Sequence, residues 1–258
     1  MIPVVVISLI RASERREHIN ASLEALGIPF RFFDAIDGKT MSPPEVAALA
    51  PLERYAGQHG RPFNAGEIGC AASFRAVLQQ IESGKDEFVC VAEDDAEFSA
   101  ASKGFLEEER LNALPKFDVF RLHNDHMNGT SGLAHRAASL DAFSVFAPVK
   151  PRLMSTAQVF SRAGAAKILK EISPLRAPFD NLIYRDSLIT GLRVLEIRPA
   201  VVDNRPMEST ISVRQKKDPT IQSTLERKGF MLLRNVRSAV NFTKAWGFRA
   251  LFRLRYYR

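Results

Sequence analysis

The sequence predicts an α/β fold in which helices flank a mostly parallel central sheet. Residues 4–9 form a β-branched run, typical of a strand that is buried on both faces. A helical pattern and a second apolar strand follow this run, which is the β–α–β order of a parallel sheet. The chain has 258 residues, of which 46% are hydrophobic, enough for one large domain with its own core.

The other elements follow from hydrophobic periodicity and from the residues that start and stop each pattern. Ser13 is placed to cap a first helix, which Gly27 ends. A second helix is expected over 65–83, and a third over 162–172 with Ser161 as its cap. Further strands are expected at 29–35, 87–92, 116–122, 142–149, 157–161 and 192–197, with a polar loop at 123–136.

The basic residues are concentrated at the C-terminus. Residues 227–258 contain nine Arg and Lys and no Asp or Glu, which exceeds the whole formal net charge of +7. The rest of the chain is therefore slightly acidic, and this argues against nucleic-acid binding by the fold as a whole. We expect a domain over 1–225 and a basic segment over 226–258.

Within the basic segment, residues 229–246 predict an amphipathic helix. Such a helix can lie in the interface of an anionic membrane, whereas the alternative is a helix packed on the domain with a solvated basic face. No apolar run approaches the roughly 20 residues that a membrane-spanning helix needs. The expected apolar face consists of Leu232, Val236, Ala239 and Trp246, and the expected basic face of Arg234, Arg237 and Lys244.

The strand expected at 87–92 runs directly into three carboxylates, Glu93, Asp94 and Asp95. Ligands of open α/β sheets bind beyond the carboxyl ends of the strands. Adjacent carboxylates repel one another unless a cation or hydrogen-bond donors neutralise them, and hard oxygen ligands suit Mg²⁺ or Mn²⁺. In an extended triplet, Glu93 and Asp95 share one side of the strand. Taken alone, the triplet is equally compatible with a metal site and with a solvated acidic turn.

Two further segments give weaker signals. Residues 8–16 place a helix N-terminus and several guanidinium groups near the same edge of the sheet, which favours phosphate. Gly66 and Gly69 permit close backbone approach at the start of a helix. The structural alternatives are a solvated basic helix start for the first segment and helix–sheet packing for the second. Cys70 and Cys90 lack the spacing of a zinc site and are interpreted as buried thiols.

The order of these motifs along the chain is more specific than any one of them. Leu-x-Arg-x-x-Glu-Arg-Arg is followed by Phe-Asp-Ala-Ile-Asp-Gly, by Gly-Glu-Ile-Gly-Cys-x-x-Ser, by an apolar strand with Glu-Asp-Asp, and later by Ala-Pro-Phe-Asp. In this order the sequence resembles glycosyltransferase family 25, the lipooligosaccharide galactosyltransferases and their collagen-modifying relatives. The resemblance covers roughly residues 3–212.

The resemblance implies a GT-A type fold, a UDP-sugar donor, galactose as the hexose, Mn²⁺ or Mg²⁺, and transfer with inversion. It implies that Asp95 binds the metal directly and that Glu93 contacts the metal through water, or contacts the ribose. The implied acceptor is a glycan, a lipopolysaccharide or another lipid-linked oligosaccharide. The other residues expected near the donor are Ser8, Arg11, Arg16 and Asp94.

Inversion needs a base that takes the proton of the acceptor hydroxyl on the side opposite the leaving diphosphate. Asp180 is the candidate, and its alternative role is to cap a helix over 182–189. Asp125 and Asp203 are rival bases. Glu67 is a further candidate, although capping its own helix or holding the acceptor is the preferred interpretation. The isolated histidines His123 and His126 are expected to be solvated, not to bind metal.

One position departs from the family pattern. Family members commonly carry histidine where this chain has Phe74, directly after Ser73. This leaves a second hypothesis, a catalytically silent, membrane-peripheral binding protein on the same fold. Residues 1–10 lack the features of a signal peptide, and no ER-retention tail is present. We therefore expect a bacterial cytoplasmic protein, peripheral on the inner face of the cytoplasmic membrane.

Overall fold

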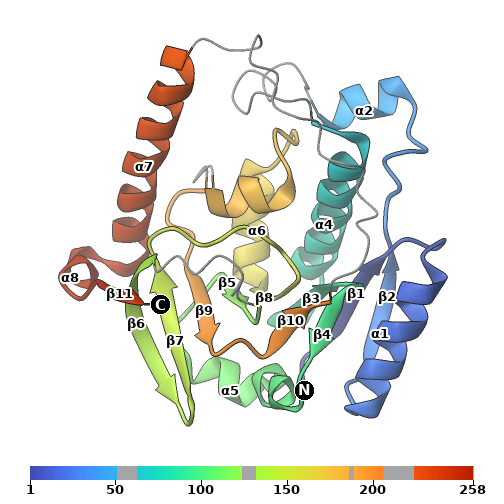
Figure 1. The fold of residues 1–258 in the computed structure, drawn as a ribbon, viewed down its shortest axis with the longest axis horizontal. Helices are drawn as coiled ribbons and strands as arrows, with labels where there is room; N and C mark the ends of the chain where they lie inside the picture. The colour runs from blue at the N-terminus through green and yellow to red at the C-terminus, as the bar shows by residue number, and fades with distance from the viewer. Residues whose placement is uncertain (51–62, 124–131, 186–188, 206–223, 258) are drawn as a thin grey trace.

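A computed structural model describes residues 1–50, 63–123, 132–185, 189–205 and 224–257 (Figure 1). Nine strands in these ranges form one sheet of order β11-β6-β7-β9-β5-β8-β3-β1-β2. A short antiparallel pair, β4 (Ala96–Phe98) with β10 (Val202–Asn204), lies outside it. The strands of the large sheet are β1 (Val4–Ser8), β2 (Phe30–Asp34), β3 (Phe88–Glu93), β5 (Val119–Arg121), β6 (Gly132–Leu140), β7 (Phe143–Pro148), β8 (Ala157–Ser161), β9 (Val194–Arg198) and β11 (Arg255–Tyr257).

Most strands of this sheet point the same way. β1 pairs in parallel with β2 and β3, and β5 pairs in parallel with β9. β8 lies antiparallel between β3 and β5, so the two parallel groups share one direction. Following the pairings outward, six of the nine strands of the described sheet run together, and β7, β8 and β11 oppose them. The predicted mostly parallel sheet is confirmed, with the carboxyl ends of β1, β2, β3, β5 and β9 at one edge.

Helices cover both faces of the sheet because the strands alternate their apolar side chains. Val4 and Val6 of β1 enter one core cluster, whereas Val5 and Ile7 enter the other. The first cluster also takes side chains from α1 (Ser13–Ala25), η1 (Ala100–Leu106) and α5 (Glu108–Asn112). The second takes side chains from α4 (Ala65–Ser83) and α6 (Arg162–Glu171), while the short α2 (Pro43–Leu49) packs on α4. The result is a three-layer α/β/α domain.

Several expected boundaries are correct and others are wrong. Ser161 caps α6, since its Oγ accepts a hydrogen bond from the N–H of Gly164 at 3.0 Å. Ser13 does not cap α1, because the N-cap is Ala12 and no side chain bonds the free N–H groups there. The loop expected at 123–136 contains the start of β6, which the sequence hides because its residues are mostly half-exposed. The helix expected over 182–189 is a single π-helical turn, η2 (Asn181–Arg185), and residues 186–188 lie outside the described ranges.

The C-terminal segment forms α7 (Thr224–Trp246), α8 (Phe248–Leu251) and β11. β11 pairs with β6, so the segment ends as an edge strand of the central sheet (Figure 1). The expected apolar face of α7 is wrong in part, since Trp246 packs on the core whereas Leu232, Val236 and Ala239 are exposed. Within the described ranges, no helix combines the length and apolarity needed to cross a membrane.

Gly69 confirms the close backbone approach predicted for the start of α4. A Cβ atom at this position would lie 2.4 Å from the carbonyl oxygen of Ile36 and 2.5 Å from the amide nitrogen of Gly38. We therefore expect Gly69→Ala to lower the free energy of unfolding by about 2 kcal/mol or more, because backbone must move to make room. Gly132→Ala is the matched control, since no heavy atom lies within 4 Å of a Cβ there. Chemical denaturation of both variants measures the difference, and equal stabilities would contradict the close packing.

Candidate active site

The carboxylate triplet lies where the carboxyl ends of β1 and β3 meet. Glu93 is the last residue of β3, and its N–H donates to the carbonyl of Thr156, which precedes β8. The chain then turns through Asp94 and Asp95 into β4. The triplet is therefore not extended as a whole, and the alternation of sides expected for an extended triplet does not apply.

Arg15 of α1 holds two of the three carboxylates. Its Nε lies 3.1 Å from Asp94 Oδ1, and its Nη2 lies 2.9 Å from Asp95 Oδ2. Ser8, the last residue of β1, donates its hydroxyl to Asp94 Oδ2 at 2.6 Å. Asp94 is thus neutralised from two sides. The remaining oxygen of Asp95, Oδ1, is buried and has no hydrogen-bond partner among the described residues.

Arg15 was not predicted as a site residue, although its spacing from two apolar residues of the same helix indicates its position. Residues 15, 19 and 23 recur at the helical spacing of four, and Ile19 and Leu23 are fully buried. Arg15 therefore heads the buried side of α1, which directs its guanidinium toward the end of the sheet. Of the two arginines that were expected near the nucleotide, Arg11 lies in the turn before α1 and Arg16 on another side of the helix.

Arg11 and Arg16 are bound by the two aspartates of the Phe-Asp-Ala-Ile-Asp-Gly motif. Arg11 Nε lies 2.8 Å from Asp37 Oδ2, and Arg16 Nη2 lies 2.5 Å from Asp34 Oδ1. Arg16 also donates to the carbonyl of Ser8 at 2.8 Å and stacks on Phe32. Both arginines therefore lie beyond the ends of β1 and β2, beside the triplet, but neither has an ion pair with it among the described contacts.

Asp180 and Glu67 lie in the same electrostatic neighbourhood as the triplet. Burial first, and then the charges of Asp95, Asp180 and Asp94, raise the pKa of Glu93 well above its ordinary value, with Arg15 opposing. Burial, together with the charge of Asp94, also raises the pKa of Asp95 against the effect of Arg15.

The thiol of Cys70 on α4 lies near the same acidic side chains. Its pKa is raised by burial and then by the charges of Glu93, Asp180, Glu67 and Asp95. Cys90 is buried as predicted, whereas Cys70 is only half-buried and faces this group of acidic side chains. The repulsion within the group favours a cation in the site.

Asp180 is fixed by two backbone donors. Its Oδ2 accepts from the N–H of Met154 at 3.1 Å and its Oδ1 from the N–H of Asn181 at 2.7 Å. The preceding residue, Phe179, stacks on Phe74 with ring centroids 4.2 Å apart and an angle of 7° between the planes. The phenylalanine that departs from the family pattern is therefore fully buried and packs directly against the segment that carries Asp180.

A buried ion pair that was not predicted from the sequence holds the backbone segment that donates to Asp180. Arg121 of β5 pairs with Glu196 of β9, and the two are register partners in adjacent parallel strands. Arg121 Nη2 donates to the carbonyls of Leu153 and Met154 at 3.1 and 3.2 Å. The same backbone segment donates to Asp180. The sequence signal for this ion pair was the placement of Arg121 and Glu196, which have opposite charges, in two mostly apolar strands.

The other candidate residues have structural roles or lie apart from the triplet. Glu67 forms the capping box of α4, with its N–H donating to Asn64 Oδ1 at 2.9 Å and its Oε2 accepting from the N–H of Asn64 at 3.2 Å. The predicted capping role is confirmed. His123 is buried, not solvated as expected, and its Nδ1 lies 3.1 Å from the carbonyl of Val202. Asp203 is exposed on β10. Asp125 and His126 lie outside the described residues.

Glu93 and Asp95 suit Mn²⁺ or Mg²⁺ as partial ligands. They supply hard oxygens, one buried and unpartnered, in a cluster where negative charges repel one another. Across the described ranges, no group of three or more His, Cys, Asp or Glu side chains is arranged to hold a metal ion. A metal bound here would therefore take further ligands from water or from a diphosphate, as Mg²⁺ sites commonly do.

The raised pKa of Glu93 gives a stability test of the site. Ionised Glu93 destabilises the metal-free fold fully at pH values above its raised pKa, and the penalty shrinks below that pKa until it vanishes below the ordinary pKa of the unfolded chain. Glu93→Gln should therefore increase the free energy of unfolding by about 1 kcal/mol at pH 8 in chelator. Urea denaturation at pH 8 and pH 5 should show the gain shrinking in acid. Glu97→Gln, an exposed neighbour, is the control, and an equal gain there would contradict the assigned cause.

Comparison with known proteins identifies the family. The model of glycosyltransferase family 25 (LPS biosynthesis protein) matches residues 1–183. The chain belongs to glycosyltransferase family 25. This confirms the resemblance drawn from the order of the motifs, and the matched range contains Arg15, the triplet and Asp180.

Curated relatives include proteins named as glycosyltransferases and proteins named as inactive. Over 185 residues the chain is 31% identical to the probable inactive glycosyltransferase 25 family member 3 of Bos taurus, covering 67% of this chain and 29% of that protein. It is 35% identical over 105 residues to the lacto-N-neotetraose biosynthesis glycosyltransferase LgtB of Neisseria gonorrhoeae, covering 40% of this chain and 36% of that protein. The matches thus span about a third of the relatives' length. A solved structure of the galactosyltransferase LgtC aligns with 90% of this chain and 96% of its own, at a TM-score of 0.41 and 12% identity.

Proposed function

We propose that this family 25 member transfers a hexose, galactose by the habit of its family, from a UDP-sugar to a glycan acceptor with inversion, on a GT-A type fold. The observation that carries the proposal is the convergence of Glu93, Asp95 and Asp180 beyond the carboxyl ends of β1 and β3. The unpartnered Asp95 Oδ1 adds a binding site that the described residues do not fill.

On the donor side, Asp95 and Glu93 would hold Mn²⁺ or Mg²⁺, which would neutralise the negative charge on the leaving UDP. Asp94 acts through its position: Ser8 and Arg15 bind it and so fix the turn that presents Asp95. Arg15 also limits the rise in the pKa of both Glu93 and Asp95, which favours the ionised form that a cation needs.

On the acceptor side, Asp180 is the proposed base. One of its carboxylate oxygens would take the proton of the acceptor hydroxyl. At the same time the hydroxyl oxygen would attack the anomeric carbon, and the bond to UDP would break. The N–H groups of Met154 and Asn181 hold the carboxylate in place before the acceptor binds. Because both donors belong to backbone, the position of Asp180 depends on the loop that Arg121 supports.

The proposed acceptor is a lipopolysaccharide or another lipid-linked oligosaccharide, reached at an anionic membrane. The family model is described as an LPS biosynthesis protein, and relatives are named for lacto-N-neotetraose biosynthesis. We place the protein in the bacterial cytoplasm, peripheral on the inner face of the cytoplasmic membrane, with its basic C-terminal segment toward the lipid. The proposed division remains a domain over 1–225 and a basic C-terminal segment over 226–258, whose strand β11 joins the sheet of that domain.

The experiment is a thermal-shift screen of UDP-sugars with and without Mn²⁺, followed by an assay of donor hydrolysis. A ligand at 100 times its Kd stabilises the fold by about 2.7 kcal/mol, which corresponds to roughly 5–10 °C for a domain of this size. We expect one UDP-sugar to give such a shift only when Mn²⁺ is present. No shift with any UDP-sugar would contradict the donor assignment.

A catalytically silent binding protein is the second candidate, favoured by two observations. Phe74 fills the position where histidine is common in the family, and some relatives are named inactive. Such a protein would still show the thermal shift but would not release UDP. Mn²⁺-dependent release of UDP from the stabilising donor supports the transferase, and binding without release supports the silent protein.

A further inference from the structure

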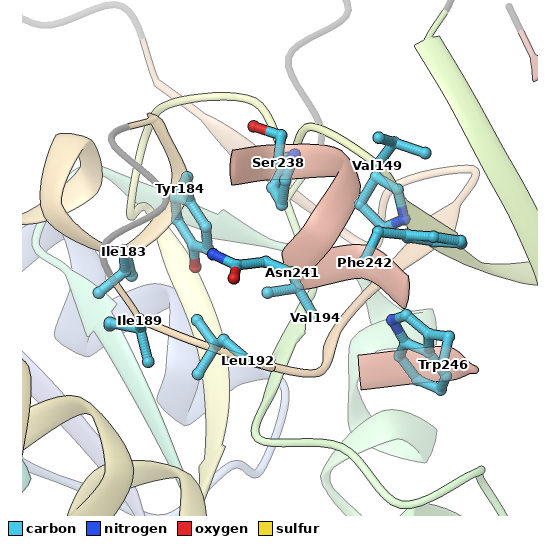
Figure 2. A pocket seen from close by; sticks show the side chains of 12 residues that line it. Val149, Ile183, Tyr184, Ile189, Leu192, Val194, Ser238, Asn241, Phe242 and Trp246 are labelled. Atoms are coloured by element: carbon cyan, nitrogen blue, oxygen red, sulfur yellow. The ribbon is translucent and has the colours of Figure 1, made fainter. Parts of the chain in front are cut away.

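The inner side of α7 fixes how this helix sits on the domain. Ser238, Asn241, Phe242 and Trp246 project from it toward β7, β9 and the η2 segment, where they line a cavity of about 40 Å³ (Figure 2). Ser238 and Phe242 are each only 4% exposed. Since these residues recur at spacings of three and four, they define one side of the helix. The opposite side must therefore face away from the domain.

That outer side of α7 is apolar. Leu232, Leu233, Val236 and Val240 are 67, 47, 54 and 45% exposed, and their spacing places them along one stripe. The adjacent α8 and its C-cap residue add Phe248 and Phe252, whose rings meet edge to face at 5.3 Å while remaining 65 and 72% exposed. Across the described ranges, seven of the eleven exposed large apolar side chains lie within residues 232–256. Single exposed apolar residues are common on protein surfaces, whereas a contiguous cluster of them marks an interaction surface.

Cations border this apolar stripe. Arg237 and Lys244 are exposed on α7, beside the apolar stripe. Arg249 and Arg253 are exposed next to the two phenylalanines. Residues 227–258 contain no Asp or Glu. The surface therefore combines a row of apolar side chains with uncompensated positive charge.

We infer that the outer side of α7, together with Phe248 and Phe252 of α8, is a surface that docks onto an anionic lipid membrane. The inference deepens the membrane association in the proposed function by assigning it to particular side chains, but it does not depend on sugar transfer. Apolar side chains enter the boundary between headgroups and acyl chains, while the cations contact the anionic headgroups.

Two other occupants fit the surface less well. A second copy of the chain would bring the same cations face to face in a symmetric interface, where they repel one another. A nucleic acid would satisfy the arginines and lysines but would leave the leucine and valine stripe in water. An anionic lipid surface satisfies both the apolar and the basic side chains.

The test is binding of the full chain to phosphatidylcholine vesicles with and without phosphatidylglycerol, measured by co-sedimentation. We expect wild-type protein to bind the vesicles that contain phosphatidylglycerol. The double variant Val236→Asp with Val240→Asp should bind at least about tenfold more weakly, because two charges enter the apolar contact. Arg249→Gln with Arg253→Gln should lose about tenfold or more on anionic vesicles only. Ile10→Asp, which changes an exposed apolar residue outside this surface, should bind like wild type.

The outcomes separate this inference from the proposed function. Donor-binding thermal shifts of the Val236→Asp with Val240→Asp variant should match wild type, since neither residue lies at the triplet. Wild-type protein that ignores anionic vesicles, or a double variant that binds them as well as wild type does, would overturn the inference. A wild-type dimer in solution that the two substitutions dissociate would assign the surface to a second copy and would also overturn it.

Discussion

Replacing Asp95 by alanine should abolish sugar transfer while the protein still folds. The change removes the buried oxygen that has no partner among the described residues, and with it the proposed direct contact to the metal. Loss of one such charge-stabilising contact in a closed site costs about 10²–10³-fold in turnover, and we expect the upper end here. The measurement is the initial rate of UDP release and product formation at saturating Mn²⁺, with circular dichroism to verify the fold.

Glu97→Ala is the matched control for Asp95→Ala. It removes a carboxylate two residues further along the chain, on β4, where the side chain is exposed. We expect its turnover to remain close to that of wild type. If Asp95→Ala itself retained near wild-type turnover with metal supplied, the assignment of Asp95 to the metal would be wrong.

Replacing Asp180 by asparagine should slow transfer without weakening UDP binding. Asparagine keeps the size of the side chain and one oxygen that can accept from the N–H of Met154, and it loses only the acceptor for the N–H of Asn181, so the loop should keep its position. The variant loses the carboxylate that takes the proton, and general base catalysis contributes about 10²–10⁴-fold. We expect kcat to fall by this factor, while the Kd for UDP measured by calorimetry stays within about twofold.

Asp203→Asn tests the rival base under the same conditions. Asp203 is exposed on β10, and its replacement should leave kcat close to the wild-type value. A large fall for Asp203→Asn and none for Asp180→Asn would exchange their roles. Loss of UDP binding in Asp180→Asn would instead move Asp180 to the donor site.

Local sequence patterns predicted the fold well where one element determines its own structure. The buried strand β1, the helix α4 and the cap of α6 lie at or within a residue of their expected bounds, because periodicity and capping residues act over a few neighbours. β6 was missed because an antiparallel strand near the edge of the sheet, half-exposed along its length, carries little apolar alternation. η2 was expected as a regular helix, since a π-helical turn leaves no distinct composition.

The site was predictable in its acidic residues but not in its arginines. Strand polarity alone places Glu93, Asp94 and Asp95 at the ligand-binding edge. Choosing among Arg11, Arg15 and Arg16 requires the rotation of α1 on the sheet, which follows from burial of Ile19 and Leu23. The sequence predicted Arg11 and Arg16 near the nucleotide, which stays a prediction, whereas the packing of α1 brings Arg15 to the triplet.

The sequence by itself determined the fold class, the family and the position of the acidic triplet, because each depends on the order and type of residues along the chain. The tertiary structure decided which charges meet. It brought Asp180 near Glu93 across 87 positions of sequence, put Phe74 against Phe179, and turned Trp246 inward while leaving Val236 outside. Such contacts depend on the orientation of each helix and loop against the sheet. That orientation follows from the free energy of burying side chains that come from distant segments of the chain.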